Sequence, residues 1–236
     1  TPPATDRPVI GMTSLGSSCL SYMKTLKPAL ESRGFEVAIF HATGMGGMAF
    51  EAIAGEGGFA AVMDFALSEV GNLYAGSVVN SGESRLTSAG AAAVPQIVAP
   101  GCIDLFDFAG WQEIPARFTD RPFHAHNRLI TSVVLREADC LMVADAHLER
   151  LATASGPTAL LVPVGGFGEW DRPGADLHNP QGLAAFVGRL LDESPANVQL
   201  HRLDAHINDD AFADAALAVL DGWIEDGTVP RHAATG

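Results

Sequence analysis

Several features common in proteins are scarce in this chain of 236 residues. It has only three cysteines, Cys19, Cys102 and Cys140, which lie far apart and form no Cys-x-x-Cys pair. A disulfide framework and a zinc site of the usual spacing are therefore not expected. No apolar run reaches the ~20 residues of a membrane span, and residues 1–8 lack the apolar core of a signal peptide. We therefore predict a cytoplasmic protein.

Positive charge is also scarce, with 14 Lys and Arg against 28 Asp and Glu and a formal net charge of −14. No Lys/Arg cluster is present that would neutralise a phosphate backbone, so nucleic acid and anionic membranes are not expected partners. The sequence has neither of the standard phosphate-binding patterns, Gly-x-x-x-x-Gly-Lys-[Ser/Thr] or Gly-x-Gly-x-x-Gly after a strand. A small anionic ligand would have to be bound where backbone amides converge.

What the chain does have is a repeated order of apolar run, Gly-rich turn and helical stretch. We predict strands from Val9 onward and over residues 36–41, 74–79, 96–99, 158–164 and 198–203. We predict helices over residues 20–33, 48–53, 59–67, 84–93, 127–136, 142–153, 182–193 and 211–224, with residues 111–126 forming an irregular excursion. This order predicts a doubly wound, Rossmann-like α/β domain over residues 9–225, with about six parallel strands and helices on both faces. Residues 1–8 are predicted to be linker-like and residues 226–236 a flexible tail.

Ligands of such sheets bind outside the carboxyl ends of the strands, where the Gly-rich loops gather. The first loop, within residues 11–19, leads into a helix whose N-terminus suits a phosphate or carboxylate. A second Gly-rich loop covers residues 42–47, and a turn covers residues 100–104. Glycine in any one of these loops is better explained by turn geometry than by a ligand, so it is the number of such loops on one edge that indicates a site.

The titratable side chains near these loops have two interpretations each. Cys19 lies close to a predicted helix N-terminus, where a thiol becomes a nucleophile, although a buried apolar role is the commoner one. His41 and His206 are candidates for hydrogen bonding or proton transfer near neutral pH. His206 lies beside Asn208 and Asp209, which are also ordinary residues before a helix.

Carboxylates at strand ends are candidates for holding Mg²⁺ on a nucleotide, since magnesium prefers one or two carboxylates plus phosphate oxygens. Asp104, Glu83 and Asp204 occupy such positions, and solvated loop acids are the alternative interpretation. Arg85 and Arg128 are candidates for pairing with phosphate or for surface ion pairs.

Five segments taken together resemble one family. They are Gly11-Met12-Thr13-Ser14-Leu15-Gly16, Phe40-His41-Ala42-Thr43-Gly44-Met45-Gly46-Gly47, Pro100-Gly101-Cys102-Ile103-Asp104, His126-Asn127 and Asp204-Ala205-His206-Ile207-Asn208-Asp209. The family is typified by the ATP-binding N-terminal region of the tomato mosaic virus resistance protein and is largely bacterial and fungal. The resemblance runs in order from about residue 8 to residue 224. Ser17-Ser18-Cys19 stands where the family often has Thr-Thr-Pro-Cys, and Cys102-Ile103-Asp104 where it often has Ala-Leu-Asp.

The resemblance implies two Rossmann-like subdomains with ATP and Mg²⁺ in or near the cleft between them, of which this chain resembles the second. The implied partner is a preceding N-terminal subdomain, in cis or as a separate chain, and a homo-oligomer is a further possibility. The implied metal ligand is Asp104. The implied nucleotide-side residues are Thr13, Ser14, Gly16, Ser17, Ser18, Thr43, Gly44, Gly46, Gly47, Gly101, Asn127 and Asn208.

Two functions follow as hypotheses. The first is an ATP- and Mg²⁺-binding module that forms one half of a two-subdomain protein. The second is a small-molecule enzyme of hydrolase or lyase type, in which Cys19, His41 or His206 acts on an anionic metabolite. A purely inhibitory interaction, as the plant member of the family makes with a viral replication protein, is a third reading with less support.

Overall fold

The computed structural model describes residues 7–16, 21–125 and 127–230. Its elements in chain order are β1 (Val9–Ser14), α1 (Ser21–Ser32), β2 (Glu36–His41), α2 (Met45–Gly55), β3 (Ala61–Asp64), α3 (Ser68–Ala75), α4 (Ser88–Ala91), β4 (Gln96–Val98), β5 (Leu105–Ala109), η1 (Ala116–Phe118), β6 (Phe123–Ala125), β7 (Ile130–Val134), α5 (Glu137–Ala152), β8 (Thr158–Pro163), η2 (Glu169–Asp171), α6 (Pro180–Asp192), β9 (Gln199–Leu203) and α7 (Asp210–Glu225).

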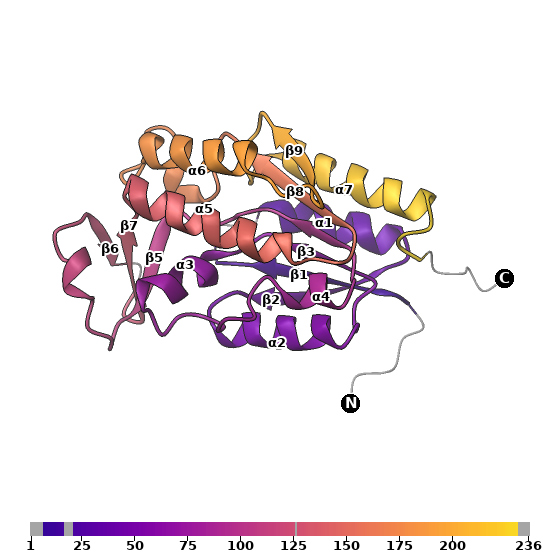
Figure 1. Cartoon of the computed structure of the whole chain (residues 1–236), viewed down its shortest axis with the longest axis horizontal. Coiled ribbons are helices and arrows are strands. Elements are labelled where there is room, and N and C mark those ends of the chain that lie inside the picture. The colour runs from indigo at the N-terminus through magenta and orange to yellow at the C-terminus, as the bar shows by residue number, and fades with distance from the viewer. Residues whose placement is uncertain (1–6, 17–20, 126, 231–236) are drawn as a thin grey trace.

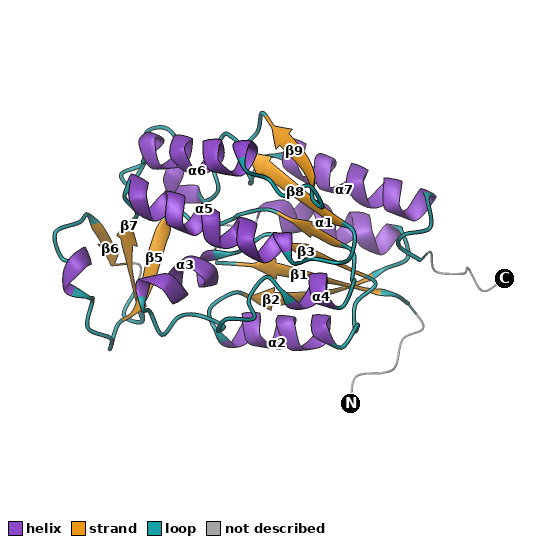
Figure 2. Ribbon diagram, in the orientation of Figure 1, coloured by secondary structure: helices purple, strands orange, loops and turns teal. Residues whose placement is uncertain are grey.

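Six strands form a parallel sheet in the order β2-β1-β3-β4-β8-β9, with helices on both faces (Figures 1 and 2). The predicted doubly wound α/β fold is thus confirmed. The strand order reverses between β1 and β3, and ligands of open α/β sheets bind beside such a switch point at the carboxyl ends of the strands.

Side chains of the central strands are buried alternately on the two faces of the sheet, because successive residues of a strand point to opposite sides. Ala159 and Leu161 of β8 pack into a core with helices α1 and α7. Leu160 and Val162 of the same strand pack into a second core with α3, α5 and α6. A smaller third core joins α2 to β3 through residues such as Phe50. Both faces of the sheet are therefore covered, as a parallel sheet requires.

Two predicted elements between residues 59 and 79 are wrong. The predicted helix over residues 59–67 is strand β3, whose residues are all buried. A fully buried strand has no polar alternation, so its apolar run resembles that of a buried helix. The predicted strand over residues 74–79 is instead the end of α3 and a turn, because Gly76 closes the helix in the left-handed conformation at φ 78°.

The predicted helix over residues 127–136 is also wrong, because residues 130–134 are strand β7. This strand pairs with β5 and β6 in a separate antiparallel sheet of order β5-β7-β6. The predicted irregular excursion over residues 111–126 contains η1 and β6. Figure 1 shows this small sheet at the end of the molecule toward which the parallel strands point. It therefore forms an outer wall at the carboxyl edge of the main sheet.

Part of the predicted C-terminal tail is packed. Val229 is fully buried, and its backbone N–H donates to the carbonyl of Trp223 at 2.9 Å. Across the residues that the structure describes, no helix combines the length and the apolar composition of a membrane span.

Candidate functional site

A pocket of about 140 Å³ lies where the carboxyl edge of the parallel sheet meets the small antiparallel sheet. Its described lining comes from the loops after β1, β2 and β4, from the loop after α3, from β5 and β7, and from η2. The lining residues are Leu15, Gly16, His41, Thr43, Val79, Cys102, Asp104, Leu105, Asp107, Asn127, Ile130, Ser132 and Trp170. Loops distant in sequence thus form one concave site at the predicted edge of the sheet.

Five of the predicted site residues meet in this pocket: Gly16, His41, Thr43, Asp104 and Asn127. The side chains of His41 and Thr43 are exposed at the end of β2. Asn127 uses its side-chain oxygen to accept hydrogen bonds from the backbone N–H groups of Leu129 and Ile130, at 2.7 and 3.0 Å. Its carbonyl therefore shapes the turn before β7.

Asp104 is a carboxyl of the pocket with one oxygen that is buried without a hydrogen bond to any described residue. Its Oδ2 atom is buried and has no hydrogen-bond partner within the described part of the chain. Burial raises the pKa of this carboxyl well above its usual range, and the negative charges of Asp171 and Asp107 raise it further. No lysine or arginine is among the described lining residues. A buried carboxyl without a cation is a feature of functional sites, although ion networks also perturb pKa values.

The outer wall of the pocket contains residues that the sequence analysis missed. On β5 and β7, Asp107 accepts a hydrogen bond from the Ser132 hydroxyl at 2.6 Å. Trp170 of η2 packs against the ring of His124, with ring centroids 4.4 Å apart. The β-branched residues Ile130, Thr131, Val133 and Val134 were a signal for a strand, but the assignment of residues 127–136 to a helix hid it.

The turn over residues 100–104 is built by its backbone. Cys102 has a φ of 59°, which is rare for a residue with a side chain, and its N–H donates to the carbonyl of Phe167 at 2.8 Å. Gly101 is buried, and its carbonyl accepts from Leu67 N–H at 2.8 Å. These bonds place the Cys102 side chain and Asp104 in the pocket wall. The predicted nucleotide contact of Gly101 remains a prediction.

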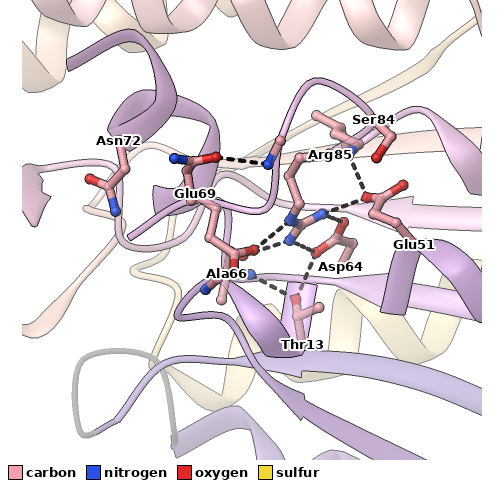
Figure 3. Close-up of polar contacts among 12 residues, drawn as sticks. Thr13, Glu51, Asp64, Ala66, Glu69, Asn72, Ser84 and Arg85 are labelled. Atoms are coloured by element: carbon pink, nitrogen blue, oxygen red, sulfur yellow. Dashed lines mark hydrogen bonds and ion pairs between the residues drawn. The ribbon is translucent and has the colours of Figure 1, made fainter. Parts of the chain in front are cut away.

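Thr13 and Arg85 lie in a buried polar cluster beneath the edge of the sheet (Figure 3). All five N–H donors of Arg85 are used: Nε donates to Glu69 at 2.7 Å, Nη1 to Asp64 and Glu51, and Nη2 to Asp64 and the Ala66 carbonyl. The Thr13 hydroxyl donates to Asp64 at 2.7 Å. Arg85 is thus neither a phosphate ligand nor a surface ion pair.

The cluster joins elements that are far apart in the sequence. Glu51 comes from α2, Asp64 from β3 and Glu69 from α3, while Arg85 comes from the loop before α4. Burial alone would lower the pKa of Arg85, but the three carboxylates outweigh it and raise the pKa well above its usual value. Arg85 is therefore permanently charged, and it fixes the loop that carries Val79 into the pocket wall.

The glycines of the second loop pack against the protein itself. A Cβ on Gly46 would lie 1.9 Å from the carbonyl oxygen of His41, and one on Gly47 would lie 2.0 Å from Oε2 of Glu69. Gly44 has a φ of 98°, and its N–H donates to the other oxygen of Glu69. The N-terminus of α2 is thus next to an internal carboxylate. The predicted phosphate contacts of Gly44, Gly46 and Gly47 remain untested, and the packing supplies another reason for each glycine.

His206 lies in a second buried polar group, away from the pocket lining. Its Nδ1 accepts from the N–H of Asn208 at 3.0 Å, so Nε2 carries the proton and faces Asp171 at 3.1 Å and the Gly168 carbonyl at 3.0 Å. Asp171 also accepts from Phe167 N–H at 2.6 Å. These bonds hold the loop that presents Trp170 to the pocket.

The remaining predicted site residues add no described side chain to the pocket. Ser14 is buried at the end of β1. Ser17, Ser18 and Cys19 lie outside the described residues, as does His126. Asn208 contacts Glu169 at 3.2 Å through its side-chain amide. No group of three or more His, Cys, Asp or Glu side chains with metal-binding geometry occurs within residues 7–16, 21–125 and 127–230.

The fold defines a doubly wound α/β protein, and its pocket lies at the carboxyl edge of the parallel sheet, where ligands of such sheets bind. Residues 7–224 match the family model described as "Uncharacterised protein family (UPF0261) C-terminal domain". The chain belongs to this family.

Relatives from bacteria and plants match nearly the whole chain. A UPF0261 protein of Brucella melitensis is 50% identical over 229 residues, which cover 97% of this chain and 55% of that protein. A UPF0261 protein of Clostridium tetani is 30% identical, covering 93% of this chain and 54% of that protein. The tomato ToMV resistance protein Tm-1(GCR237) is 29% identical over 94% of this chain and 29% of its own length. The chain therefore spans about half the length of its bacterial relatives.

Solved structures are only distantly similar. The esterase domain of a Rhodothermus marinus protein has 14% identity and a TM-score of 0.46, covering 94% of this chain and 88% of that domain. Similarity at this level says nothing about the activity of this chain.

Proposed function

We propose that the pocket binds the magnesium complex of a small phosphorylated molecule and that ATP is the ligand to test first. The observation that carries this proposal is Asp104, whose buried Oδ2 has no partner in the described part of the chain and whose acidic neighbours are Asp107 and Asp171. The described lining has carboxylates and no lysine or arginine, so a cation that binds together with an anionic ligand would offset their repulsion. Carboxylate oxygens beside hydroxyl and amide groups are ligands that Mg²⁺ accepts.

The lining residues and the volume of the pocket suit a metal-bound phosphate group better than a whole nucleotide. Asp104 would hold the cation, with Asp107 adding negative charge, and Ser132 and Asn127 line the same pocket. The volume of about 140 Å³ lies below the ~300 Å³ of a typical site for a drug-sized ligand. The nucleoside would therefore extend out of the pocket, and the chain spans only about half the length of its bacterial relatives. This arrangement supports a module that forms one half of a composite site.

The test is calorimetric titration of the chain with MgCl₂, with ATP and with Mg-ATP. We expect Mg-ATP to bind, and Asp104→Asn to weaken its binding by at least ~10-fold, since even the loss of a partner outside the direct ligands of a metal typically weakens its binding by this factor. Asp214→Asn, at an exposed position of α7, is the matched control and should leave the affinity unchanged. Binding that is equally tight in Asp104→Asn and in the unaltered chain would refute the role of Asp104. No binding of Mg-ATP would refute the nucleotide.

A second candidate function is a small-molecule hydrolase that uses His41 and Asp104 as its acid–base pair. The small volume of the pocket and the raised pKa of Asp104 favour it, because a carboxyl that stays protonated can serve as a general acid. Hydrolysis of p-nitrophenyl acetate tests it. Turnover above the buffer rate that is lost in His41→Asn would support this candidate, and no turnover would count against it.

A further inference from the structure

Helix α2 has no charged side chain on its outer face. The exposed residues of that face recur at helical spacing: Met45, Met48, Ala49, Ala52 and Ile53. Met45 is 81% exposed and Met48 49%. We call this set the α2 face. It is unusual in a chain with 28 acidic residues, and α1 by contrast exposes Lys24 and Glu31.

The inner face of α2 is already packed. Phe50 and Ala54 contribute to the core against β3, and Glu51, the one charged residue of the helix, is buried in the Arg85 cluster. The helix is therefore uncharged wherever it meets solvent. A helix that is apolar on all sides is normally covered on all sides.

The α2 face lies at the rim of the sheet and beside the start of β1. Strand β2 is the edge strand of the parallel sheet, and Ala38 and Phe40 on it pack against the core beneath α2. The Pro8 carbonyl accepts from Glu36 N–H at the start of β2, and the Val9 carbonyl accepts from Ala60 N–H after α2. The chain thus enters β1 between β2 and the segment that follows α2. Figure 1 shows α2 at the edge of the molecule, with no other element outside it.

We infer that the α2 face is the docking surface for the N-terminal region of the longer family members. The matching family model is a C-terminal domain, and the chain covers 54–55% of the bacterial relatives. A region that precedes residue 7 in the same polypeptide is tethered next to α2, so it meets this surface at high effective concentration. A second copy of the chain has no such tether. Small Ala side chains between Met side chains allow close approach of another helix or sheet.

The test compares the same substitution in two settings. Ala52→Arg in the present chain should leave its melting temperature unchanged, because the side chain is exposed. Arginine at the matching position of the full-length Brucella melitensis protein should separate the two regions. The expected readouts are a larger radius of gyration by X-ray scattering and faster proteolysis of the segment that joins the regions. The matched control is arginine at the position of Ala152, an exposed alanine at the end of α5.

Separation by the Ala52 substitution alone, with the control compact, would support the docking surface. Full-length variants that both keep the radius and the proteolysis rate of the unaltered protein would overturn it. A dimer of the present chain in light scattering that Ala52→Arg converts to a monomer would assign the α2 face to a second copy and would also overturn the inference.

Discussion

At the scale of single residues, the Arg85 side chain holds several elements of the protein together. It satisfies its five donors inside the protein and connects α2, β3 and α3, although nothing beside it in the sequence identifies its partners. The cluster holds three carboxylates against one guanidinium. Removing the one cation leaves buried negative charges uncompensated, which costs far more than the loss of a surface ion pair.

We predict that Arg85→Met lowers the free energy of unfolding by about 3–5 kcal/mol. Urea unfolding followed by circular dichroism measures the effect. Arg189→Met is the matched control, because Arg189 makes a surface ion pair with Asp145 at 3.4 Å, and its effect should stay below about 1 kcal/mol. Equal effects in the two variants would contradict a special role for the buried cluster.

At the scale of single elements, the glycines of α2 determine how closely this helix packs against the rest of the protein. Gly46 has no room for a methyl group because the carbonyl of His41 occupies that space, whereas Gly55 at the end of the same helix meets only the Ser88 side chain at 3.5 Å. Alanine is the better helix former at both positions when packing allows it. Substitution of alanine at the two positions therefore distinguishes the effect of packing on stability from that of helix propensity, within one helix.

We predict that Gly46→Ala destabilises the chain by roughly 1–3 kcal/mol, as overpacking does. Gly55→Ala should be neutral or stabilise it by up to about 1 kcal/mol. Thermal unfolding of the two variants side by side checks both signs. A melting temperature for Gly46→Ala at or above that of the unaltered chain would show that a methyl group fits at this position.

At the scale of the whole molecule, stability should depend on pH through a buried histidine. His147 on α5 is 1% exposed, and burial lowers its pKa to about 4, while its Nδ1 lies 2.6 Å from the Val143 carbonyl. The unfolded chain, with a histidine pKa near ~6.5, binds more protons than the folded chain between these two values. Stability is therefore lost as the pH falls from about 6.5 toward 4.

We predict that this histidine accounts for roughly 2 kcal/mol of lost stability between pH 7 and pH 5. His147→Gln should reduce the pH dependence by about that amount, measured as the difference between urea unfolding curves at the two pH values. His201→Gln is a control at a less buried histidine and should reduce it less. An unchanged pH dependence in His147→Gln would refute the assignment.

The local pattern of the sequence determined most of the parallel sheet. The apolar strands from Val9 and over residues 36–41, 96–99, 158–164 and 198–203 were predicted, because each ends in a Gly or polar turn and precedes a helix. Their common direction placed their loops on one edge. His41 and Asp104 were predicted as site residues from their places at strand ends, and Gly16, Thr43 and Asn127 from the family resemblance; all five line the pocket.

Tertiary structure alone decided which side chains share the pocket and which lie in the interior. Thr13 and His206 stand beside site loops in the sequence, yet burial and hydrogen bonding place both in polar clusters within the protein. Asp107 and Ser132 enter the pocket because β5 and β7 pair at a distance of 25 residues. Local sequence reports propensity and periodicity, whereas these partners are set by long-range pairing and by the requirement that buried polar groups be satisfied.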